Sequence, residues 1–273
     1  CLRAHRAGYW NVLCDDAFVL HLGGRSFAGE KALLSPPNTA ILLARHPAYA
    51  AIVGEPTELN LALAERGGAW ITATARGTAA HGSTPHLGVS AITSMARFLL
   101  RIEEVLPDIE HPLVGRPSVN AALINGGSAP NVVADRCVVD IDRRVIPGER
   151  AAETVLAPFD ALAASIWAEH PEVDLSFAVK MWTDAAETTG DSRIADLCRD
   201  AVRTETGREP LDTGFTGITD ARVYINDRSI PTVILGPGSL TVAHMVNESV
   251  EVAELVAAAR VYARVFVGFL GGS

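Results

Sequence analysis

The order of strand and helix patterns in the middle of the chain constrains its fold more than any other feature. Strands are indicated where apolar and polar residues alternate, and helices where apolar residues recur every three or four positions. These patterns predict, in order, a strand over 68–77, a helix over 88–107, strands over 118–127 and 132–148, a helix over 149–170 and a strand over 172–182. The order β-α-β-β-α-β predicts a ferredoxin-like α+β domain over residues 66–183.

Both predicted helices of this domain have a distinctive feature. The first carries an apolar stripe made of Ile92, Met95, Ala96, Leu99, Leu100 and Ile102. The second contains Pro158, which lacks the N–H that a helix interior uses. This proline therefore either kinks the helix or marks a break in it.

The segments on either side are typical of an α/β domain. A short buried strand in AYAAIVGEPT runs into a turn that contains Glu55, and the apolar run at 230–238 is typical of a buried, parallel strand. Helices are expected over 192–207, ending at Gly207, and over 247–270, with Asn247 or Ser249 as the cap. The predicted fold class is therefore α/β, with the α+β domain inserted between residues 1–65 and 184–273. Within the first piece, residues 1–30 are atypical because they show no readable period.

Charge and composition exclude several classes of function. The net charge of −9 disfavours a nucleic-acid partner, because phosphate binding requires clustered Lys and Arg. No apolar run is long enough to cross a bilayer, and the N-terminal CLRAHRAGYW lacks the apolar core of a secretory signal. The cysteines show no CxxC pairing, so a reducing cytoplasm is the expected location. Neither a P-loop nor a GxSxG motif is present in this sequence.

Glu55 and His244 each follow the C-terminal end of a predicted buried strand. Together they would place a carboxylate and an imidazole at one edge of a sheet, a pair of ligands that zinc accepts. Two ligands are insufficient, however, because a catalytic zinc site needs three from the protein. Taken singly, each residue is also explained as an ordinary loop residue, with Glu55 as a turn acid before Pro56.

The middle of the chain supplies further polar candidates. His81 precedes a predicted helix and is suited to stabilising an oxyanion. An ordinary polar loop, in which Ser83 or Thr84 caps the N-terminus of the following helix, explains the segment equally well. Arg143 and Arg144 point to opposite faces of a strand, so only one of them can face a site. Arg144 is suited either to clamping a carboxylate or to a surface ion pair with Asp140 or Asp142.

Four segments in order carry a family resemblance. They are IVGEPTELN, ERGGAWITATARGTAAHGSTPHLGVSAI, NGGSAPNVVADRCVVDIDRRVIPGE and GITDARVYINDRSIPTVILGPGSLTVAHMVNESV. Together they resemble the zinc-dependent family of acetylornithine deacetylases, succinyl-diaminopimelate desuccinylases and carboxypeptidase G-type metallopeptidases, from about residue 50 onward. The resemblance implies an α/β catalytic domain, two zinc ions (with cobalt or manganese as alternatives) and an inserted ferredoxin-like lid that forms a homodimer.

The resemblance also implies a reaction and the residues that carry it out. The reaction is hydrolysis of the amide bond of an N-acyl amino acid or small peptide, with a Glu as general base. Glu55 would ligate one zinc ion and His244 the other. His81 would reach across the dimer into the partner's active site and stabilise the developing oxyanion.

The substrate-binding residues are implied in the same way. Asn131, also from the lid, and Arg144 would hold the carboxylate of the substrate. The turn around Thr219 and the turn from Gly236 to Gly238 would line the pocket.

The chain departs from the family pattern near its N-terminus. The family's His-x-Asp motif and bridging Asp are expected before residue 1, and Leu22, Gly23 and Gly24 stand where an Asp-Glu-Glu motif is expected. We therefore expect that residues 1 to about 30 are not family sequence and that the site is incomplete. The alternative function is a catalytically inactive remnant that acts as a dimerising or regulatory binding protein.

Overall fold

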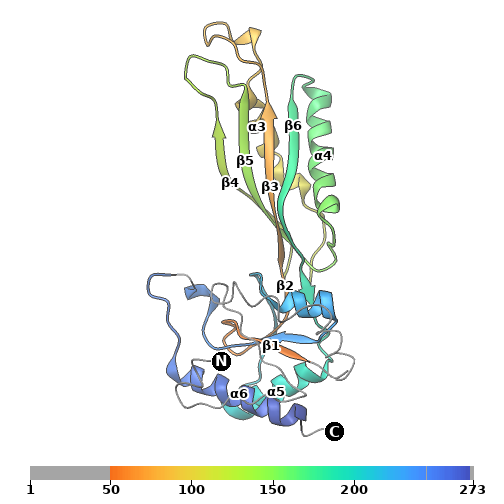
Figure 1. Ribbon diagram of the computed structural model, residues 1–273, viewed down its shortest axis with the longest axis vertical. Coiled ribbons are helices and arrows are strands. Elements are labelled where there is room, and N and C mark those ends of the chain that lie inside the picture. The colour runs from red at the N-terminus through yellow and green to blue at the C-terminus, as the bar shows by residue number, and fades with distance from the viewer. Residues whose placement is uncertain (1–49, 244, 271–273) are drawn as a thin grey trace, which may run out of the picture. The chain divides into compact units, whose positions relative to one another are not determined.

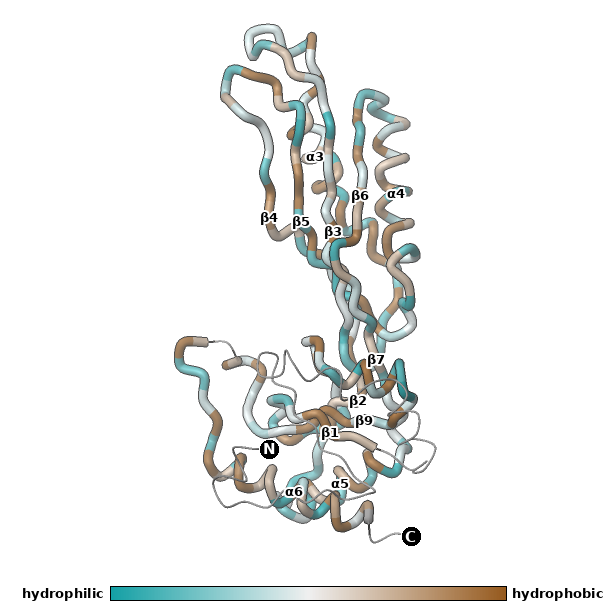
Figure 2. The backbone as a smooth tube through the Cα atoms, in the orientation of Figure 1, coloured by the Kyte–Doolittle hydropathy of each residue, from teal (hydrophilic) through white to brown (hydrophobic). Residues whose placement is uncertain are grey.

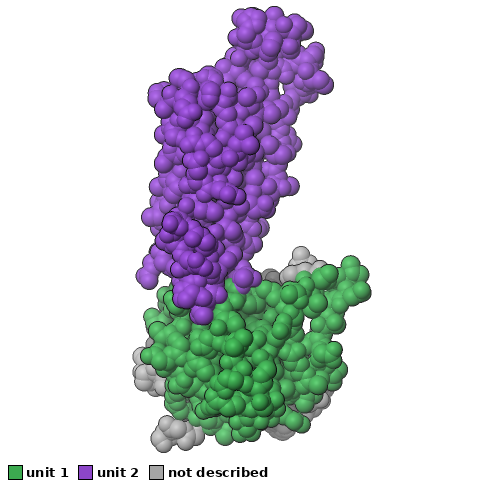
Figure 3. Space-filling view, turned by 180° about the vertical axis from the view of Figure 1, so that it is seen from behind, with its two compact units in different colours: residues 1–64, 187–215, 219–273 green, residues 65–186, 216–218 purple. Residues whose placement is uncertain are grey.

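The computed structural model describes residues 50–243 and 245–270. The expectation about residues 1–30 and the predicted ligand His244 lie outside this part of the chain. Residue contacts divide the described residues into two compact units (Figure 3). Unit 1 comprises the described residues within 1–64, 187–215 and 219–273, and unit 2 comprises residues 65–186 and 216–218.

Unit 2 contains a four-stranded antiparallel sheet in the order β4-β5-β3-β6. Its elements, in chain order, are β3 (Gly67–Arg76), η1 (Pro85–Leu87), α3 (Ala91–Leu99), η2 (Ile102–Val105), β4 (Ser118–Gly126), β5 (Arg136–Val145), α4 (Ala152–Glu169) and β6 (Asp174–Thr183). Helix α3 packs on β3 and β5, and α4 packs on β6 (Figure 1). This order and pairing confirm the predicted ferredoxin-like arrangement.

The buried face of α3 differs from the predicted stripe. The helix ends at Leu99 and buries Ala91, Ser94, Met95 and Phe98. Ile92 and Leu100, which the stripe included, are 44% and 87% exposed. An aromatic cluster accounts for the difference, because the ring centroid of Phe98 lies 5.1 Å from that of Phe177. Burying this large ring fixes the rotation of the helix more strongly than the smaller aliphatic residues do.

Helix α4 continues through Pro158 from Ala152 to Glu169. Of the two alternatives considered for this proline, a kink or a break, the continuous helix excludes the break. The helix buries Val155, Phe159, Leu162 and Ile166 along one face. This apolar burial on both sides of Pro158 offsets the lost backbone hydrogen bond.

Unit 1 is built on a mixed sheet in the order β1-β9-β2-β7, with β8 also paired to β2. Its elements are β1 (Ala51–Val53), β2 (Leu61–Glu65), β7 (Ala186–Glu187), α5 (Arg193–Thr206), β8 (Asp212–Phe215), the π-helix η3 (Val223–Asp227), β9 (Thr232–Ile234), η4 (Leu240–Val242) and α6 (Val252–Leu270). Figure 2 shows apolar stretches along β1, β2 and β9, whose side chains form much of the core. Strand β9 lies parallel to β1, as the apolar run at 230–238 predicted.

The ends of the two long helices of unit 1 test the cap predictions. Helix α5 ends at Gly207 in the left-handed conformation (φ 68°), which confirms the predicted C-terminus. Helix α6 begins at Val252, so the predicted start and caps at Asn247 or Ser249 are wrong. Val250, two residues before the helix, lies next to the turn at Gly238. None of the described helices is long and apolar enough to cross a membrane.

Candidate functional site

Two turns meet at the carboxyl ends of the parallel strands β1 and β9. The first contains Glu55 and Thr57, and the second runs from Gly236 to Ser239. The N–H of Thr57 donates to the carbonyl of Gly236 (3.3 Å), and the N–H of Gly236 donates to the hydroxyl of Thr57 (3.1 Å). The N–H of Glu58 donates to the carbonyl of Gly238 (2.8 Å). The fold thus holds the half-buried Glu55 beside Gly236 and Gly238, three residues that the family resemblance placed in one site.

Gly236 is required by close backbone packing in this region. A Cβ atom at this position would lie 2.5 Å from the carbonyl oxygen of Glu55 and 3.1 Å from its backbone nitrogen. Backbone atoms cannot move aside as a flexible side chain can. Gly238 has a different requirement, because its φ of +87° is one that L side chains rarely adopt.

Replacing Gly236 by Ala is therefore expected to displace the turn that carries Glu55. We expect a loss of about 1–3 kcal/mol in the free energy of unfolding, measured by urea denaturation. Gly190→Ala is the matched control in the same unit, since the three nearest atoms to its added Cβ lie 3.5–3.7 Å away and all belong to side chains. Equal losses in the two variants would contradict the close-packing argument.

His81 and Asn131 are exposed and lie on adjacent loops of unit 2. The N–H of Gly82 donates to the carbonyl of Asn131 (2.7 Å), and the N–H of Val133 donates to the carbonyl of Ala80 (2.9 Å). His81 also forms an isolated β-bridge with Val132. The structure therefore brings together two residues that are 50 positions apart in the sequence and that the resemblance assigned to substrate.

In the alternative interpretation of the His81 segment, the choice of Ser83 or Thr84 as the helix cap is wrong. The residue that caps α3 is Ser90, whose hydroxyl accepts the N–H of Thr93 (3.3 Å). Ser83 contacts the ring of His81 instead, with 2.7 Å between its Oγ and the ring Nδ1. Thr84 precedes a short 3-10 helix without capping it through its side chain.

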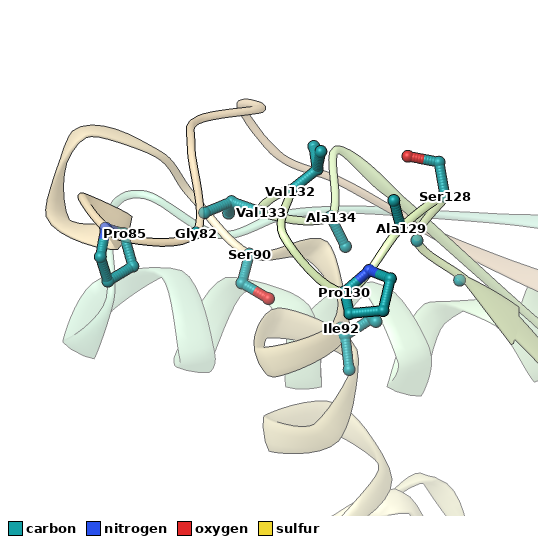
Figure 4. A pocket seen from close by; sticks show the side chains of 12 residues that line it. Gly82, Pro85, Ser90, Ile92, Ser128, Ala129, Pro130, Val132, Val133 and Ala134 are labelled. Carbon is teal, nitrogen blue, oxygen red and sulfur yellow. The ribbon is translucent and has the colours of Figure 1, made fainter.

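A shallow pocket of about 660 Å³ lies beside these loops (Figure 4). Ser90 and Ile92 line it on one side, and Pro130 and its neighbours in the loop between β4 and β5 complete the lining. The sequence indicated Asn131 at the end of this loop but not the residues from Gly126 to Pro130 that line the pocket. The signal that would have indicated them is the run of small residues in this stretch, which leaves open space between two strands.

Arg143 and Arg144 point to opposite faces of β5, as the strand pattern predicted. Arg143 is buried, whereas the side chain of Arg144 is 34% exposed and pairs with Asp142 at 2.9 Å. Of the two acids considered for an ion pair with Arg144, Asp140 instead pairs with Lys180 at 2.8 Å. The role of Arg144 in holding a substrate carboxylate stays a prediction, since its guanidinium already has a carboxylate partner.

Thr219 is buried, at 5% exposure. Its hydroxyl accepts the N–H of Ala221 (3.0 Å), and its carbonyl accepts a hydrogen bond from the guanidinium of Arg222. These contacts stabilise the turn before the π-helix η3. The pocket-lining role predicted for this turn stays a prediction.

The predicted zinc site is only partly covered by the described residues. Glu55 is among them, but His244 is not. Within residues 50–243 and 245–270, no group of three or more His, Cys, Asp or Glu side chains is arranged to hold a metal ion. One carboxylate does not make a catalytic zinc site, which needs three protein ligands. The described residues by themselves therefore do not fit a zinc ion.

The fold and the two loop regions define an α/β protein with a ferredoxin-like second unit, and comparison with known proteins shows which family it resembles. Residues 63–169 match the peptidase dimerisation domain, M20_dimer. The chain is 29% identical to an acetylornithine deacetylase from Myxococcus xanthus over 84% of this chain and 59% of the relative. It is 28% identical to a probable carboxypeptidase from Aspergillus niger over 90% of this chain and 55% of the relative.

Solved structures support the same relationship at the level of the fold. The aminopeptidase PepT from Bacillus cereus has a TM-score of 0.66 at 23% identity, with 83% of this chain and 59% of that chain covered. Human carnosine dipeptidase 1 has a TM-score of 0.63 at 13% identity, with 89% and 64% covered. The chain is therefore similar to M20 deacetylases and peptidases, and residues 63–169 match the dimerisation domain of that family. It spans about half to three-fifths of the length of the curated relatives that it matches.

Proposed function

We propose that the protein hydrolyses the amide bond of N-acyl amino acids or small peptides. The observation that carries this proposal is the joined pair of turns at the carboxyl ends of β1 and β9, which holds Glu55 beside Gly236 and Gly238. Open α/β sheets bind their ligands at this edge. Relatives named as a deacetylase and a carboxypeptidase support the same class of reaction.

The polar groups on the described surface have distinct roles in this proposal. The exposed imidazole of His81 would donate a hydrogen bond to the carbonyl oxygen as negative charge develops on it. Asn131 and Arg144 would bind the carboxylate of an amino acid substrate. The turn at Thr219 and the turn from Gly236 to Gly238 would line the pocket.

The family is metal-dependent, and we propose zinc, with cobalt or manganese as alternatives. Glu55 and His244 are the proposed ligands in this chain. We also propose a reducing cytoplasm as the location, because the cysteines show no CxxC pairing.

A hydrolysis screen over N-acyl amino acids and dipeptides tests the proposed reaction. With the purified protein of full natural length, we expect release of a free amino acid, and His81→Gln should lower kcat by about 100-fold or more. His86→Gln is the matched control, because His86 is a nearby exposed histidine with no proposed role. Failure to cleave any substrate, or equal effects of the two substitutions, would contradict the proposal.

A second candidate function is a catalytically inactive protein that dimerises or regulates an intact relative. The feature that favours it is the departure near the N-terminus, where Leu22, Gly23 and Gly24 stand in place of the expected Asp-Glu-Glu motif. Metal analysis of the purified chain decides between the candidates. Two zinc ions per chain would contradict an inactive remnant, whereas a metal-free chain would favour it.

We also propose that the chain forms a homodimer through unit 2. Within the described part of the chain, β4 pairs with β5 on one side and has no paired strand on the other. Leu123 and Ile124 on this edge strand are 68% and 63% exposed. An exposed apolar edge strand is a template for pairing with another chain.

Replacing Leu123 by Arg is expected to convert the dimer to a monomer, because a charge on the apolar edge opposes pairing. Light scattering coupled to size exclusion measures the mass directly, against 28.9 kDa for one chain. Trp167→Arg is the control, since Trp167 is similarly exposed (58%) but lies on α4, which packs on the opposite edge strand β6. A dimer that survives Leu123→Arg would contradict this interface.

A further inference from the structure

The ring of His81 receives two contacts from Ser83. The Nδ1 atom lies 2.7 Å from the Oγ of Ser83 and 3.2 Å from its backbone nitrogen. A backbone N–H can only donate, so Nδ1 must act as the acceptor in this arrangement. In a neutral imidazole one ring nitrogen carries the proton and the other accepts. The proton of His81 is therefore on Nε2.

The backbone around this contact is held at several points. The N–H of Thr84 donates to the carbonyl of His81 (2.9 Å), and the N–H of Gly82 donates to the carbonyl of Asn131 (2.7 Å). A Cβ atom on Gly82 would lie 3.0–3.1 Å from backbone atoms of Asn131, so the two loops are in close contact (Figure 4). These contacts hold the backbone of the loop, so the remaining freedom of the ring lies in its side-chain torsions and in its tautomer.

We propose that Ser83 is a positioning residue that holds His81 in the Nε2–H tautomer, with this N–H directed away from its own loop as a hydrogen-bond donor. The proposal rests on the proposed function, in which His81 donates to the carbonyl oxygen of the substrate. A histidine in the other tautomer would present a lone pair to that oxygen and could not stabilise its negative charge. Ser83 itself does not touch the substrate in this proposal.

Nuclear magnetic resonance on the full chain tests the tautomer without any need for activity. Two-bond ¹H–¹⁵N correlation spectra of histidine-labelled protein distinguish protonated from unprotonated ring nitrogens, and His81→Gln assigns the signals of His81. At mildly alkaline pH we expect a protonated Nε2 and an unprotonated Nδ1. Ser83→Ala removes the 2.7 Å hydroxyl contact and leaves only the backbone N–H at 3.2 Å as a donor to Nδ1, so it should raise the population of the other tautomer, and Ser83→Thr should restore the original form. A protonated Nδ1 in the unmodified chain, or an unchanged tautomer in Ser83→Ala, would overturn the proposal.

A neighbouring residue provides the matched control. The hydroxyl of Thr84 lies 3.4 Å from the carbonyl of His81 and makes no hydrogen bond to the ring. Thr84→Ala should therefore leave the tautomer unchanged, and a shift as large as that of Ser83→Ala would show that general loosening of the loop is responsible. Circular dichroism confirms in each case that the variant is folded.

Kinetics separate the positioning role from the proposed function itself. If hydrolysis is observed, Ser83→Ala should lower kcat by about tenfold with little change in KM, and Ser83→Thr should recover it. A shifted tautomer with unchanged kcat would overturn the positioning role, although amide hydrolysis would stand. If no substrate is cleaved, the proposed function fails, while the tautomer measurement still decides whether Ser83 sets the proton of His81.

Discussion

Replacing Arg143 by Met is expected to lower the free energy of unfolding by about 3–5 kcal/mol. Its side chain is 1% exposed, and its guanidinium contacts the carboxylate of Glu149 at 2.5 Å. Burial lowers the pKa of this guanidinium, while the charge of Glu149 raises it. Removal of Arg143 would leave the carboxylate of Glu149, which is only 11% exposed, without its opposite charge. Urea unfolding followed by circular dichroism measures the loss.

The neighbouring arginine is the control for this experiment. The pair of Arg144 with Asp142 is about one-third exposed, so Arg144→Met should change the free energy of unfolding by about 1 kcal/mol or less. The double variant Arg143→Met with Glu149→Leu should regain much of the stability, because it leaves no buried charge. Similar losses for the two single variants, or no recovery in the double variant, would contradict the buried-pair explanation.

Replacing Phe159 by Ala is expected to lower the free energy of unfolding by about 3–5 kcal/mol. Phe159 is 0% exposed, and its ring centroid lies 6.0 Å from that of Phe98 and 5.5 Å from that of Phe177. Truncation would remove the contacts of one ring and leave a cavity between α3, α4 and β6. The same urea experiment measures this loss.

Trp167 on the same helix is the matched control for Phe159. It is 58% exposed, so Trp167→Ala should change the free energy of unfolding by about 0.5 kcal/mol or less. This comparison separates loss of core packing from any general effect of alanine in α4. A loss below about 1 kcal/mol in Phe159→Ala would show that the three rings are not a core element of unit 2.

Much of the fold follows from the local sequence pattern. The alternation in β3 and β5 and the order of helices and strands predicted the ferredoxin-like unit, which the strand order confirms. The same alternation predicted that Arg143 and Arg144 face opposite sides. Gly207 predicted the end of α5 because only a residue tolerant of positive φ ends a helix in this way.

Which face of α3 is buried was not predictable from the local pattern. Its apolar residues occupy more than one face, and the ring of Phe98 is buried only because Phe159 and Phe177 come from other elements to meet it. The start of α6 was not predictable either, and Val250 just before it lies next to the distant turn at Gly238. Both outcomes involve contacts with residues that are far away in the sequence.

The sequence by itself therefore determined the types and order of the elements and the family resemblance. Helical and strand periods are properties of the local backbone, so a single stretch of sequence carries them. Only the tertiary structure decided that Gly236 packs against the backbone of Glu55 and that Gly82 packs against Asn131. It likewise decided that Arg143, rather than Arg144, forms the buried ion pair. Such contacts depend on close packing between distant segments, where a few tenths of an ångström separate a fit from a clash.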